Sequence, residues 1–280
     1  MKVKIIASDL DGTLLNDTAG LTPPTAECLK KAHQNGIKIV FATGRAFEAM
    51  PAQIKEFPFA DYVICSNGAA IYSLRKKELL KSHVLDKNSA LALIRFATEN
   101  SLGLELITQG KAYGEKYYFE HPEAFGFDER SIRYLNATRT KIENLDTFVN
   151  QNLHQLESID FVLKEPHQRD KIKSMFSDNS LLYITSSHPR IIEFSARGCG
   201  KANALRYILE KEKLSQRELI AFGNADNDLE MLFLAHMGVA TANSPASVQR
   251  AADAVCPSCN EDGVAVYLNE LLKEIKKERD

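Results

Sequence analysis

The sequence is short of cysteine and has no apolar run long enough to cross a bilayer. Its 280 residues include five cysteines, an odd count that argues against a disulfide framework and for a reducing compartment. The longest apolar runs, such as residues 37–43, fall far below the roughly 18–20 residues of a membrane span. We therefore expect no transmembrane segment.

The N-terminus also lacks the features of a secretion signal. The opening MKVKIIASD offers three apolar residues in a row before Ser8 and Asp9 interrupt the run, which is too short for the core of a signal peptide. Together with the cysteine count, this predicts a cytoplasmic protein.

An excess of one charge is lacking as well. The 35 Lys and Arg residues nearly balance the 37 Asp and Glu residues, for a formal net charge of −2. Such a chain has no long-range attraction to nucleic acid or to acidic membranes. No G-x-G-x-x-G follows a predicted strand and no Walker A sequence occurs, which excludes the common nicotinamide and P-loop sites. A small soluble ligand is the expected partner.

The sequence does contain enough apolar residues, 44%, to bury a core in one or two domains. Its first third alternates apolar runs with amphipathic stretches in a β-α-β-α-β order, which is typical of a buried parallel sheet. We predict strands at 3–7, 37–41 and 62–65 and helices at 23–35 and 46–57. The rhythm returns after Gly200, with helices at 202–212, 228–235 and 244–252 and strands at 219–222 and 239–240.

The middle of the chain has a different pattern. It predicts helices at 88–100 and 167–176, strands at 104–108, 113–119, 159–163, 182–185 and 190–194, and an irregular aromatic region at 121–136. Helices with antiparallel strand pairs indicate an α+β unit. We therefore predict an α/β fold with a three-layer Rossmann-like parallel-sheet core, formed by residues 1–84 and 195–280, and an inserted α+β domain at 85–194.

Two predicted strands end in clusters of carboxylates and amides. Residues 5–13 read IIASDLDGT and place Asp9 and Asp11 two positions apart, and residues 219–228 read LIAFGNADND. Ligands of parallel α/β sheets bind beyond the carboxyl ends of the strands, so the two clusters can meet over one crevice. Clustered acids suit a hard divalent cation, and Mg²⁺ in proteins usually comes with a phosphate.

The dipeptide Asp11-Gly12 also fits a hairpin turn. This alternative is disfavoured because Leu14-Leu15 is followed at once by the polar residues 16–20. That leaves no second strand of useful length to pair with the first.

Two further segments offer groups for an anion. Thr43, Gly44 and Arg45 follow another predicted strand and supply a hydroxyl, a backbone N–H and a cation, each suited to a phosphate oxygen. Lys201 opens a helix, where its ammonium group could reach the crevice. Taken singly, either segment also reads as an ordinary helix start with a surface cation. The position of residues 43–45 at a core strand end favours the phosphate role there.

Taken together, these pieces resemble the haloacid dehalogenase superfamily, and within it the Cof-type phosphatases with a type IIB cap inserted between the second and third motifs. The first motif, DxDGT, is specific and spans Asp9 to Thr13. The resemblance covers essentially the whole chain. Its other matching segments are 43–45, Lys201, the Ser-Asn-Gly-Ala element at 66–69, 240–243 and 260–263.

The resemblance implies a role for each motif residue. Asp9 would be the nucleophile that forms an aspartyl-phosphate, and Asp11 the acid and then the base. The backbone after Asp9, at Leu10, would help to hold the phosphate. The other phosphate-binding residues would be Thr43, Gly44, Lys201 and Asn227, the Mg²⁺ site would involve Asp9, Asp11, Asn224 and Asp228, and substrate contacts would come from Arg45 and Asn67. A mobile cap would close over the site.

One position departs from the family pattern. Where the family usually has GDxxND, this chain has GNADND, so Asn224 stands in place of an aspartate expected to bind Mg²⁺ directly. An amide oxygen still binds a hard cation, but one negative charge is lost, which should weaken metal affinity. Asp226 is a candidate for compensating the loss.

The sequence therefore predicts a Mg²⁺-dependent phosphatase of a small phosphorylated metabolite, with sugar phosphates as the first candidates. A phosphomutase of the same superfamily is the enzymatic alternative, and a weakly active protein that binds phosphometabolites is the other, because of Asn224. The substrate and the oligomeric state do not follow from the sequence.

Other features carry less signal. Cys256-Pro-Ser-Cys259 does not open a helix after a core strand as a redox pair would, and no second Cys-x-x-Cys or close His pair completes a zinc site. We predict a loop there. The seven scattered histidines lie beside no motif, and the aromatic residues between 117 and 127 are expected to fill the small core of the inserted domain.

Overall fold

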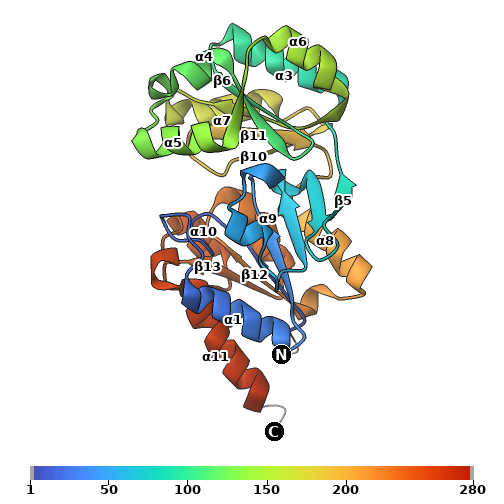
Figure 1. The fold of residues 1–280 in the computed structure, drawn as a ribbon, viewed down its shortest axis with the longest axis vertical. Coiled ribbons are helices and arrows are strands. Elements are labelled where there is room, and N and C mark those ends of the chain that lie inside the picture. Colours follow the sequence, from blue (N-terminus) through green and yellow to red (C-terminus); the bar gives the residue numbers. More distant parts are fainter. Residues whose placement is uncertain (1–2, 278–280) are drawn as a thin grey trace. The chain divides into compact units, whose positions relative to one another are not determined.

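The computed structural model describes residues 3–277, with side chains as far as residue 273 (Figure 1). The chain divides into two compact units. The core unit comprises residues 3–43, 51–80 and 200–277, and the middle unit comprises Gly44–Met50 and Lys81–Cys199. No helix in the described part of the chain is both long and apolar enough to cross a membrane.

The core unit is built on a mostly parallel sheet. In spatial order its described strands are β14 (Ala254–Cys256), β13 (Met237–Thr241), β12 (Leu219–Gly223), β1 (Ile5–Ser8), β2 (Lys38–Ala42), β3 (Tyr62–Cys65), β4 (Ala70–Ser73) and β5 (Glu78–Ser82). Strands β14 to β3 run parallel, and β4 is antiparallel to β3. Ser8 lies level with both Phe222 and Phe41, so β12, β1 and β2 end at the same edge.

Helices cover both faces of this sheet. They are α1 (Pro23–Gln34), α2 (Ala52–Lys55), α8 (Lys201–Glu212), α9 (Leu229–Leu234), α10 (Ala246–Ala251) and α11 (Gly263–Lys277). Ala221 of β12 packs in one apolar cluster with Leu205 of α8. The next residue, Phe222, points to the opposite face and stacks edge-on against Tyr267 of α11. The predicted three-layer α/β core is confirmed.

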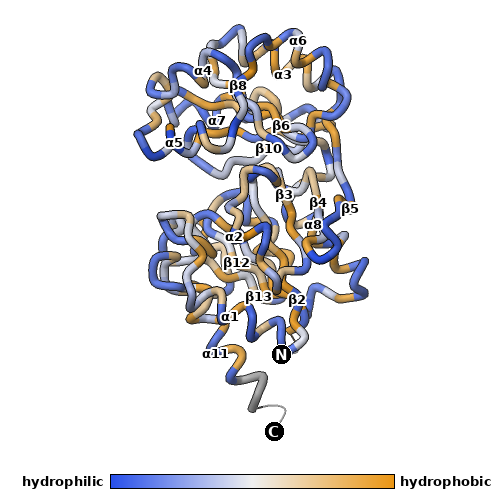
Figure 2. Tube along the Cα trace, in the orientation of Figure 1, coloured by the Kyte–Doolittle hydropathy of each residue, from blue (hydrophilic) through white to orange (hydrophobic). Residues whose placement is uncertain are grey.

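The strands form where the sequence is apolar and β-branched. Every residue of β1 and β12 is buried, as expected of parallel strands covered on both faces. Figure 2 shows apolar residues along the strands and more hydrophilic residues at the connecting turns. Helix α1 begins as predicted, with Thr22 as N-cap and prolines in its first turn, and Gly36 follows its last turn at φ +79°.

The middle unit has its own six-stranded sheet in the described residues. The spatial order is β10 (Leu182–Thr185), β11 (Ile191–Ala196), β9 (Leu156–Val162), β6 (Gly103–Thr108), β7 (Lys111–Glu115) and β8 (Arg139–Ile142). All neighbours are antiparallel except β7 and β8. Its helices are α3 (Lys87–Glu99), α4 (Lys116–Glu120), α5 (Glu129–Thr138), α6 (Leu145–Asn152) and α7 (Arg169–Phe176).

Three predicted elements were wrong. The helix expected at 46–57 is split into a 3₁₀ turn (Phe47–Ala49) and α2, because Met50 precedes Pro51 and is extended. The strand expected at 113–119 ends at Glu115, whose carboxylate accepts hydrogen bonds from the first N–H groups of α4. The region 121–136 is not irregular: it holds a 3₁₀ turn (Pro122–Phe125) and most of α5, which Asp128 caps.

Gly68 of the core unit is required by both its backbone conformation and the backbone that packs against it. Gly68 has φ +95°, and a Cβ there would lie 2.5 Å from the carbonyl oxygen of Gly200. Gly36 serves as the comparison, because it has a similar φ of +79° but no heavy atom within 4 Å of a Cβ.

We expect Gly36→Ala to lower the free energy of unfolding by about 1–2 kcal/mol through backbone strain alone. Gly68→Ala should lose roughly 1–3 kcal/mol more, because the backbone of Gly200 must shift. Urea denaturation of the two variants measures the difference. Equal losses would contradict the predicted clash.

Candidate active site

The carboxyl edge of the core sheet gathers most of the predicted site residues. Asp9 follows β1, Thr43 follows β2, and the turn from Asn224 to Asp228 follows β12. Since β12, β1 and β2 are adjacent and parallel, their ends bring these side chains together. The convergence of the two acid-bearing strand ends is therefore present in the structure.

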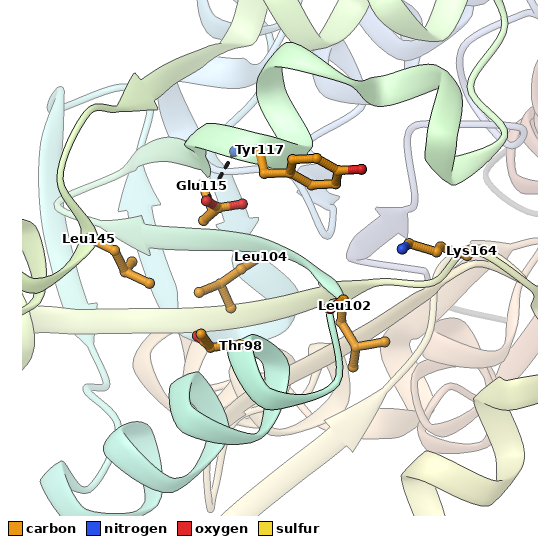
Figure 3. A pocket seen from close by; sticks show the side chains of 8 residues that line it. Thr98, Leu102, Leu104, Glu115, Tyr117, Leu145 and Lys164 are labelled. Carbon is orange, nitrogen blue, oxygen red and sulfur yellow. Dashed lines mark hydrogen bonds between the residues drawn. The ribbon is translucent and has the colours of Figure 1, made fainter.

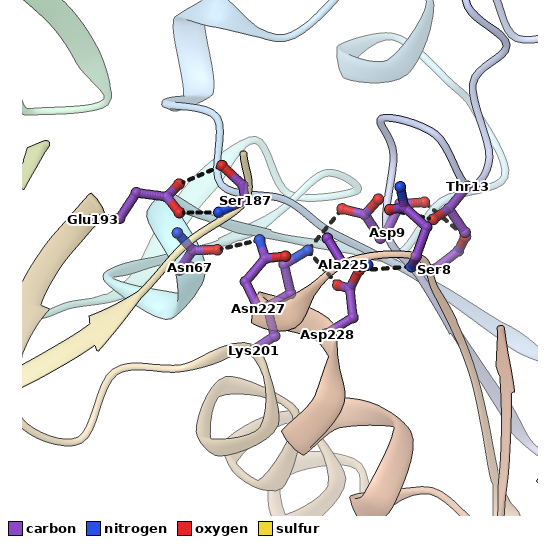
Figure 4. A network of polar contacts seen from close by, with 11 residues as sticks. Ser8, Asp9, Thr13, Asn67, Ser187, Glu193, Lys201, Ala225, Asn227 and Asp228 are labelled. Atoms are coloured by element: carbon purple, nitrogen blue, oxygen red, sulfur yellow. Dashed lines mark hydrogen bonds and ion pairs between the residues drawn. The ribbon is translucent and has the colours of Figure 1, made fainter. Parts of the chain in front are cut away.

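A buried lysine joins two carboxylates at this edge (Figure 4). The Nζ atom of Lys201 lies 2.7 Å from Oδ1 of Asp9 and 2.7 Å from Oδ1 of Asp228. Lys201 and Asp228 are fully buried, and Asp9 is 5% exposed. Lys201 is the first residue of α8, and Gly200 before it has φ +105°, which turns the chain into the helix.

The charges of this cluster are not balanced, and a further positive charge would stabilise it. Burial raises the pKa of the Asp9 carboxyl to about 7, with Lys201 opposing the rise and Asp228 and Asp11 adding to it. Burial alone would lower the pKa of the Lys201 ammonium, but the Asp228 and Asp9 carboxylates outweigh it and raise that pKa. One ammonium faces two buried carboxylates, so a further cation would favour the ionised form of Asp9.

The turn after β12 is organised around Asp228. Its Oδ2 atom accepts hydrogen bonds from the backbone N–H groups of Asn224 at 2.9 Å and Ala225 at 3.0 Å. A Cβ at Gly223 would lie 2.4 Å from the Cβ of Asp228. The Gly-Asn-Ala-Asp-Asn-Asp sequence therefore holds Asp228 in place by both its glycine and its backbone.

The side-chain amide of Asn224 points toward Asp9. One end of the amide lies 3.2 Å from Oδ2 of Asp9, 3.1 Å from the main-chain oxygen of Asp11 and 3.1 Å from Oγ1 of Thr13. Hydrogen bonding is satisfied when this end is the nitrogen, because it then donates to all three oxygens.

The same geometry is compatible with a magnesium ion. Ligand oxygens around octahedral Mg²⁺, with bonds of 2.0–2.1 Å, lie about 3 Å apart. The amide oxygen of Asn224, turned inward, would have this spacing from Asp9 Oδ2 and the Asp11 carbonyl. Among the described residues, no group of three or more His, Cys, Asp or Glu side chains is arranged to hold a metal ion. A site here would therefore depend on an amide and a carbonyl beside one carboxylate.

Asn67 links three neighbouring loops of the core unit. Its N–H donates to the carbonyl of Thr43 at 3.1 Å, and its carbonyl accepts from the N–H of Gly200 at 2.7 Å. Its Oδ1 atom accepts from Nδ2 of Asn227 at 2.9 Å. Asn67 is 3% exposed and has φ +49°, a left-handed conformation that asparagine tolerates better than most residues.

The remaining predicted site residues lie as follows. Leu10 is buried, and its carbonyl accepts hydrogen bonds from the N–H groups of residues 13, 14 and 15, which closes the turn that carries the exposed Asp11. Gly44 and Arg45 belong to the middle unit. There the Arg45 guanidinium lies 4.6 Å from the ring centroid of Tyr134 and donates to the carbonyl of Ala49 at 3.0 Å.

The C-terminal motif segments support the Asp-Gly-Thr turn. The carbonyl of Gly12 accepts from Asn243 Nδ2 at 2.8 Å and from Thr241 Oγ1 at 3.2 Å. Asn260 pairs with Asp17 through two hydrogen bonds. The sequence identified these segments only by resemblance, whereas the structure gives them a supporting role behind Asp9 and Asp11.

A row of buried acids in the middle unit was missed. Glu105, Asp160 and Glu193 lie level on the adjacent strands β6, β9 and β11. Burial raises the pKa of Asp160 well above its usual range, and the neighbouring Glu193 and Glu105 add to the rise. Arg139 and Tyr118 bind Glu105, which gives the row a structural explanation. The available signal was an acidic residue inside each of these largely apolar strands.

The middle unit also contains a pocket of about 290 Å³ (Figure 3). Its apolar part includes Leu102, Leu104 and Leu145, and its polar part includes Glu115, Tyr117 and Lys164. Since none of the predicted site residues lines it, we place the candidate chemistry at the strand ends of the core unit.

The cysteines take no part in the site. All five are buried, and none is paired in a disulfide. Burial raises the pKa of the Cys256 thiol to about 11 and also raises that of Cys259, so neither is a thiolate at neutral pH. The predicted loop begins after Cys256, the last residue of β14, and Cys259 starts a 3₁₀ turn (Cys259–Glu261).

We expect Lys201→Met to lower the free energy of unfolding by about 3–5 kcal/mol, because Asp9 and Asp228 lose their shared buried cation. The control is Lys30→Met in α1, where the lysine is partly exposed and pairs with Glu27, and the change should stay within about 0.5 kcal/mol. Chemical denaturation measures both. Similar losses in the two variants would show that the buried pairing contributes little.

Comparison with known proteins agrees with the motifs. Residues 6–268 match the haloacid dehalogenase-like hydrolase family. The phosphatase YwpJ of Bacillus subtilis is 26% identical over 96% of this chain and 100% of its own length. The pyridoxal phosphate phosphatase YbhA of Escherichia coli is 26% identical over 96% of this chain and 98% of its own.

A solved structure shares the fold. The subclass IIB sugar phosphatase BT4131 superposes with a TM-score of 0.79 at 20% identity, over 96% of this chain and 99% of that one. The match spans nearly the full length of both chains and includes both sequence halves of the core unit. The chain therefore belongs to the haloacid dehalogenase-like hydrolases, the family that its motifs predict.

Proposed function

We propose that this chain is a Mg²⁺-dependent phosphatase that hydrolyses a small phosphorylated metabolite through an aspartyl-phosphate on Asp9. The observation that carries the proposal is the position of the Asp9 carboxylate. It lies at the carboxyl edge of a central parallel strand, with the Lys201 ammonium at one oxygen and the Asn224 amide at the other.

In the first step, an oxygen of Asp9 forms a bond to phosphorus while the ester P–O bond breaks. Asp11, which is exposed and two residues away, donates a proton to the departing alcohol. In the second step, Asp11 takes a proton from a water molecule that attacks the same phosphorus. The aspartyl P–O bond breaks, which releases inorganic phosphate and restores Asp9.

The transferring group carries negative charge that the site must stabilise. Lys201 supplies a fixed cation beside Asp9, and Thr43 and Asn227 supply polar groups at neighbouring strand ends. The backbone N–H groups of Leu10 and Gly44 complete the proposed phosphate contacts. Asp9, the Asp11 carbonyl and Asn224 would hold Mg²⁺, with Asp228 fixing the turn behind them. Bound there, the cation would offset the repulsion between phosphate and carboxylate.

The names of relatives support a small substrate. Phosphatases of this family generally use Mg²⁺, and the relatives above are named for pyridoxal phosphate and for sugar phosphates. We propose a metabolite of this size, a cytoplasmic location, and selectivity determined by the middle unit as a type IIB cap domain, with Arg45 among the substrate contacts.

Asn224 favours a second candidate, a weakly active protein that binds phosphometabolites. A phosphomutase is the remaining alternative. The three are separated by the fate of the phosphoryl group, which passes to water, stays on the substrate, or moves to a second hydroxyl.

The test is a phosphate-release screen over pyridoxal phosphate, sugar phosphates and nucleotides, with Mg²⁺ and with EDTA. We expect release that requires Mg²⁺ and falls to background in Asp9→Asn, because the nucleophile is lost. A second assay uses an aryl ester with a labelled phosphate, because its leaving group departs without a general acid. The wild-type protein should carry the label transiently, and Asp11→Asn should accumulate it.

Unchanged release by Asp9→Asn would overturn the proposal. Absence of release at saturating Mg²⁺ would favour the binding protein, and label recovered on a second hydroxyl would favour the mutase.

Asn67 is better placed to position other residues than to contact a substrate, since its backbone and its side-chain oxygen are engaged by Thr43, Gly200 and Asn227. We expect Asn67→Gly, which tolerates the left-handed backbone, to lower kcat roughly 10–100-fold with little change in KM. Asn67→Asp keeps an acceptor for Asn227 and should retain more activity. A rise in KM at constant kcat would instead indicate substrate contact.

A further inference from the structure

The Asn224 amide has two chemically different ends, an oxygen and an NH₂ group. The metal-free site and the metal-bound site each favour a different one of them next to Asp9. Its inward end faces a carboxylate oxygen of Asp9, the carbonyl of Asp11 and the hydroxyl of Thr13. The first two groups are pure acceptors when Asp9 is ionised. An amide oxygen at this position would face acceptors without a hydrogen, whereas an amide nitrogen donates to them.

We infer that the Asn224 side-chain amide takes the place of the cation in the metal-free chain and rotates by half a turn when the cation binds. Without metal, its NH₂ group donates to Asp9 and Asp11. With metal, rotation of the amide by half a turn presents the oxygen from the same position. This inference rests on the Mg²⁺ site of the proposed function. It adds a mechanism by which the amide NH₂ group and the cation replace each other at that site.

Charge gives the first argument. With all groups ionised, the side chains of Asp9, Asp11 and Asp228 carry three negative charges against one positive charge on Lys201. An aspartate at 224 would face Asp9 Oδ2 and the Asp11 carbonyl at 3.1–3.2 Å with no hydrogen to donate, so it would repel them until a cation entered. Asparagine removes that repulsion, and the metal-free site is stable by itself.

Hydrogen bonding gives the second argument. The inward NH₂ group holds Asp9 Oδ2 while Lys201 holds Asp9 Oδ1 at 2.7 Å, so both carboxylate oxygens have partners without metal. A cation must break the contacts of the NH₂ group before it binds the same oxygens. The predicted cost is weaker binding of Mg²⁺ than an aspartate at this position would give.

The space around the amide gives the third argument. Gly12, at φ +76°, packs against the outer end of the Asn224 amide, and a Cβ there would lie 2.5 Å from that end. The glycine leaves room for either an oxygen or a nitrogen at the outer position. Both orientations therefore fit without movement of the backbone.

The first measurement compares thermal unfolding of wild type and Asn224→Asp in EDTA and across a Mg²⁺ titration, with no phosphate present. We expect the variant to melt at least about 3 °C lower in EDTA and to recover steeply with Mg²⁺, while wild type changes little. Calorimetric titration should give Mg²⁺ affinity roughly 10–100-fold tighter in the variant.

Asn203→Asp is the charge control. It adds the same charge to the core unit at an exposed position of α8, where the asparagine accepts a hydrogen bond from Arg206. It should show neither the loss in EDTA nor the steep Mg²⁺ response.

The second measurement uses wild type alone and does not depend on the variant folding in EDTA. The side-chain ¹⁵N–¹H₂ signals of Asn224, assigned by their absence in Asn224→Asp, should be protected from exchange in EDTA. They should lose that protection when Mg²⁺ is added. Both measurements use Mg²⁺ without substrate, so they stand or fall independently of phosphate release.

Equal Mg²⁺-dependent stabilisation and affinity in wild type and Asn224→Asp would overturn the inference. So would an Asn224 amide that exchanges freely in EDTA, or a failure of both chains to bind Mg²⁺.

Discussion

The arrangement of the site depends on one buried ammonium shared by two carboxylates. Lys201 can be fully buried only because Asp9 and Asp228 each bind it at 2.7 Å, since an unpaired buried charge carries a large desolvation cost. The same contacts set the rotamer of Asp9 and join the start of α8 to the ends of β1 and β12. The stability of this buried cluster and the proposed chemistry of Asp9 therefore depend on the same interaction.

Backbone groups of the surrounding loops hold the partners of that interaction in place. Asp228 is held by two N–H groups of its own turn, and Asn67 receives the N–H of Gly200 just before Lys201. Asn67 adopts the left-handed region to do so, a conformation that asparagine tolerates better than most residues. Asn67 lies beside the proposed chemistry and is itself buried, at 3% exposure.

The core unit and most strands of the middle unit could be predicted from the sequence, but helices α4 and α5, which follow Glu115, could not. Buried parallel strands such as β1 and β12 give unbroken apolar runs, and the rule that ligands bind at their carboxyl ends places Asp9 near Asp228 without coordinates. In the middle unit, the aromatic residues after Glu115 look like a strand, but the Glu115 carboxylate caps a helix instead. The cap at Asp128 was a readable helix start that the aromatic composition obscured. The orientation of the Asn224 amide depends on contacts made across more than two hundred residues, so no local pattern reveals it.

The segment Gly44–Met50 limits how the middle unit can be exchanged between related proteins by recombination. It leaves the core strand β2 and packs on the middle unit, where Ala46 and Ala49 are buried against Ile107 and Ala112. The backbone N–H of Glu48 donates to the carbonyl of Gly110 there. The middle unit is thus assembled from two stretches of chain. A segment cut at residues 81 and 199 and transplanted into a relative would lose its apolar contacts with Ala46 and Ala49. Recombination that preserves the unit must carry both stretches, including Gly44 and Arg45, so these two residues of the proposed site would be inherited with the middle unit.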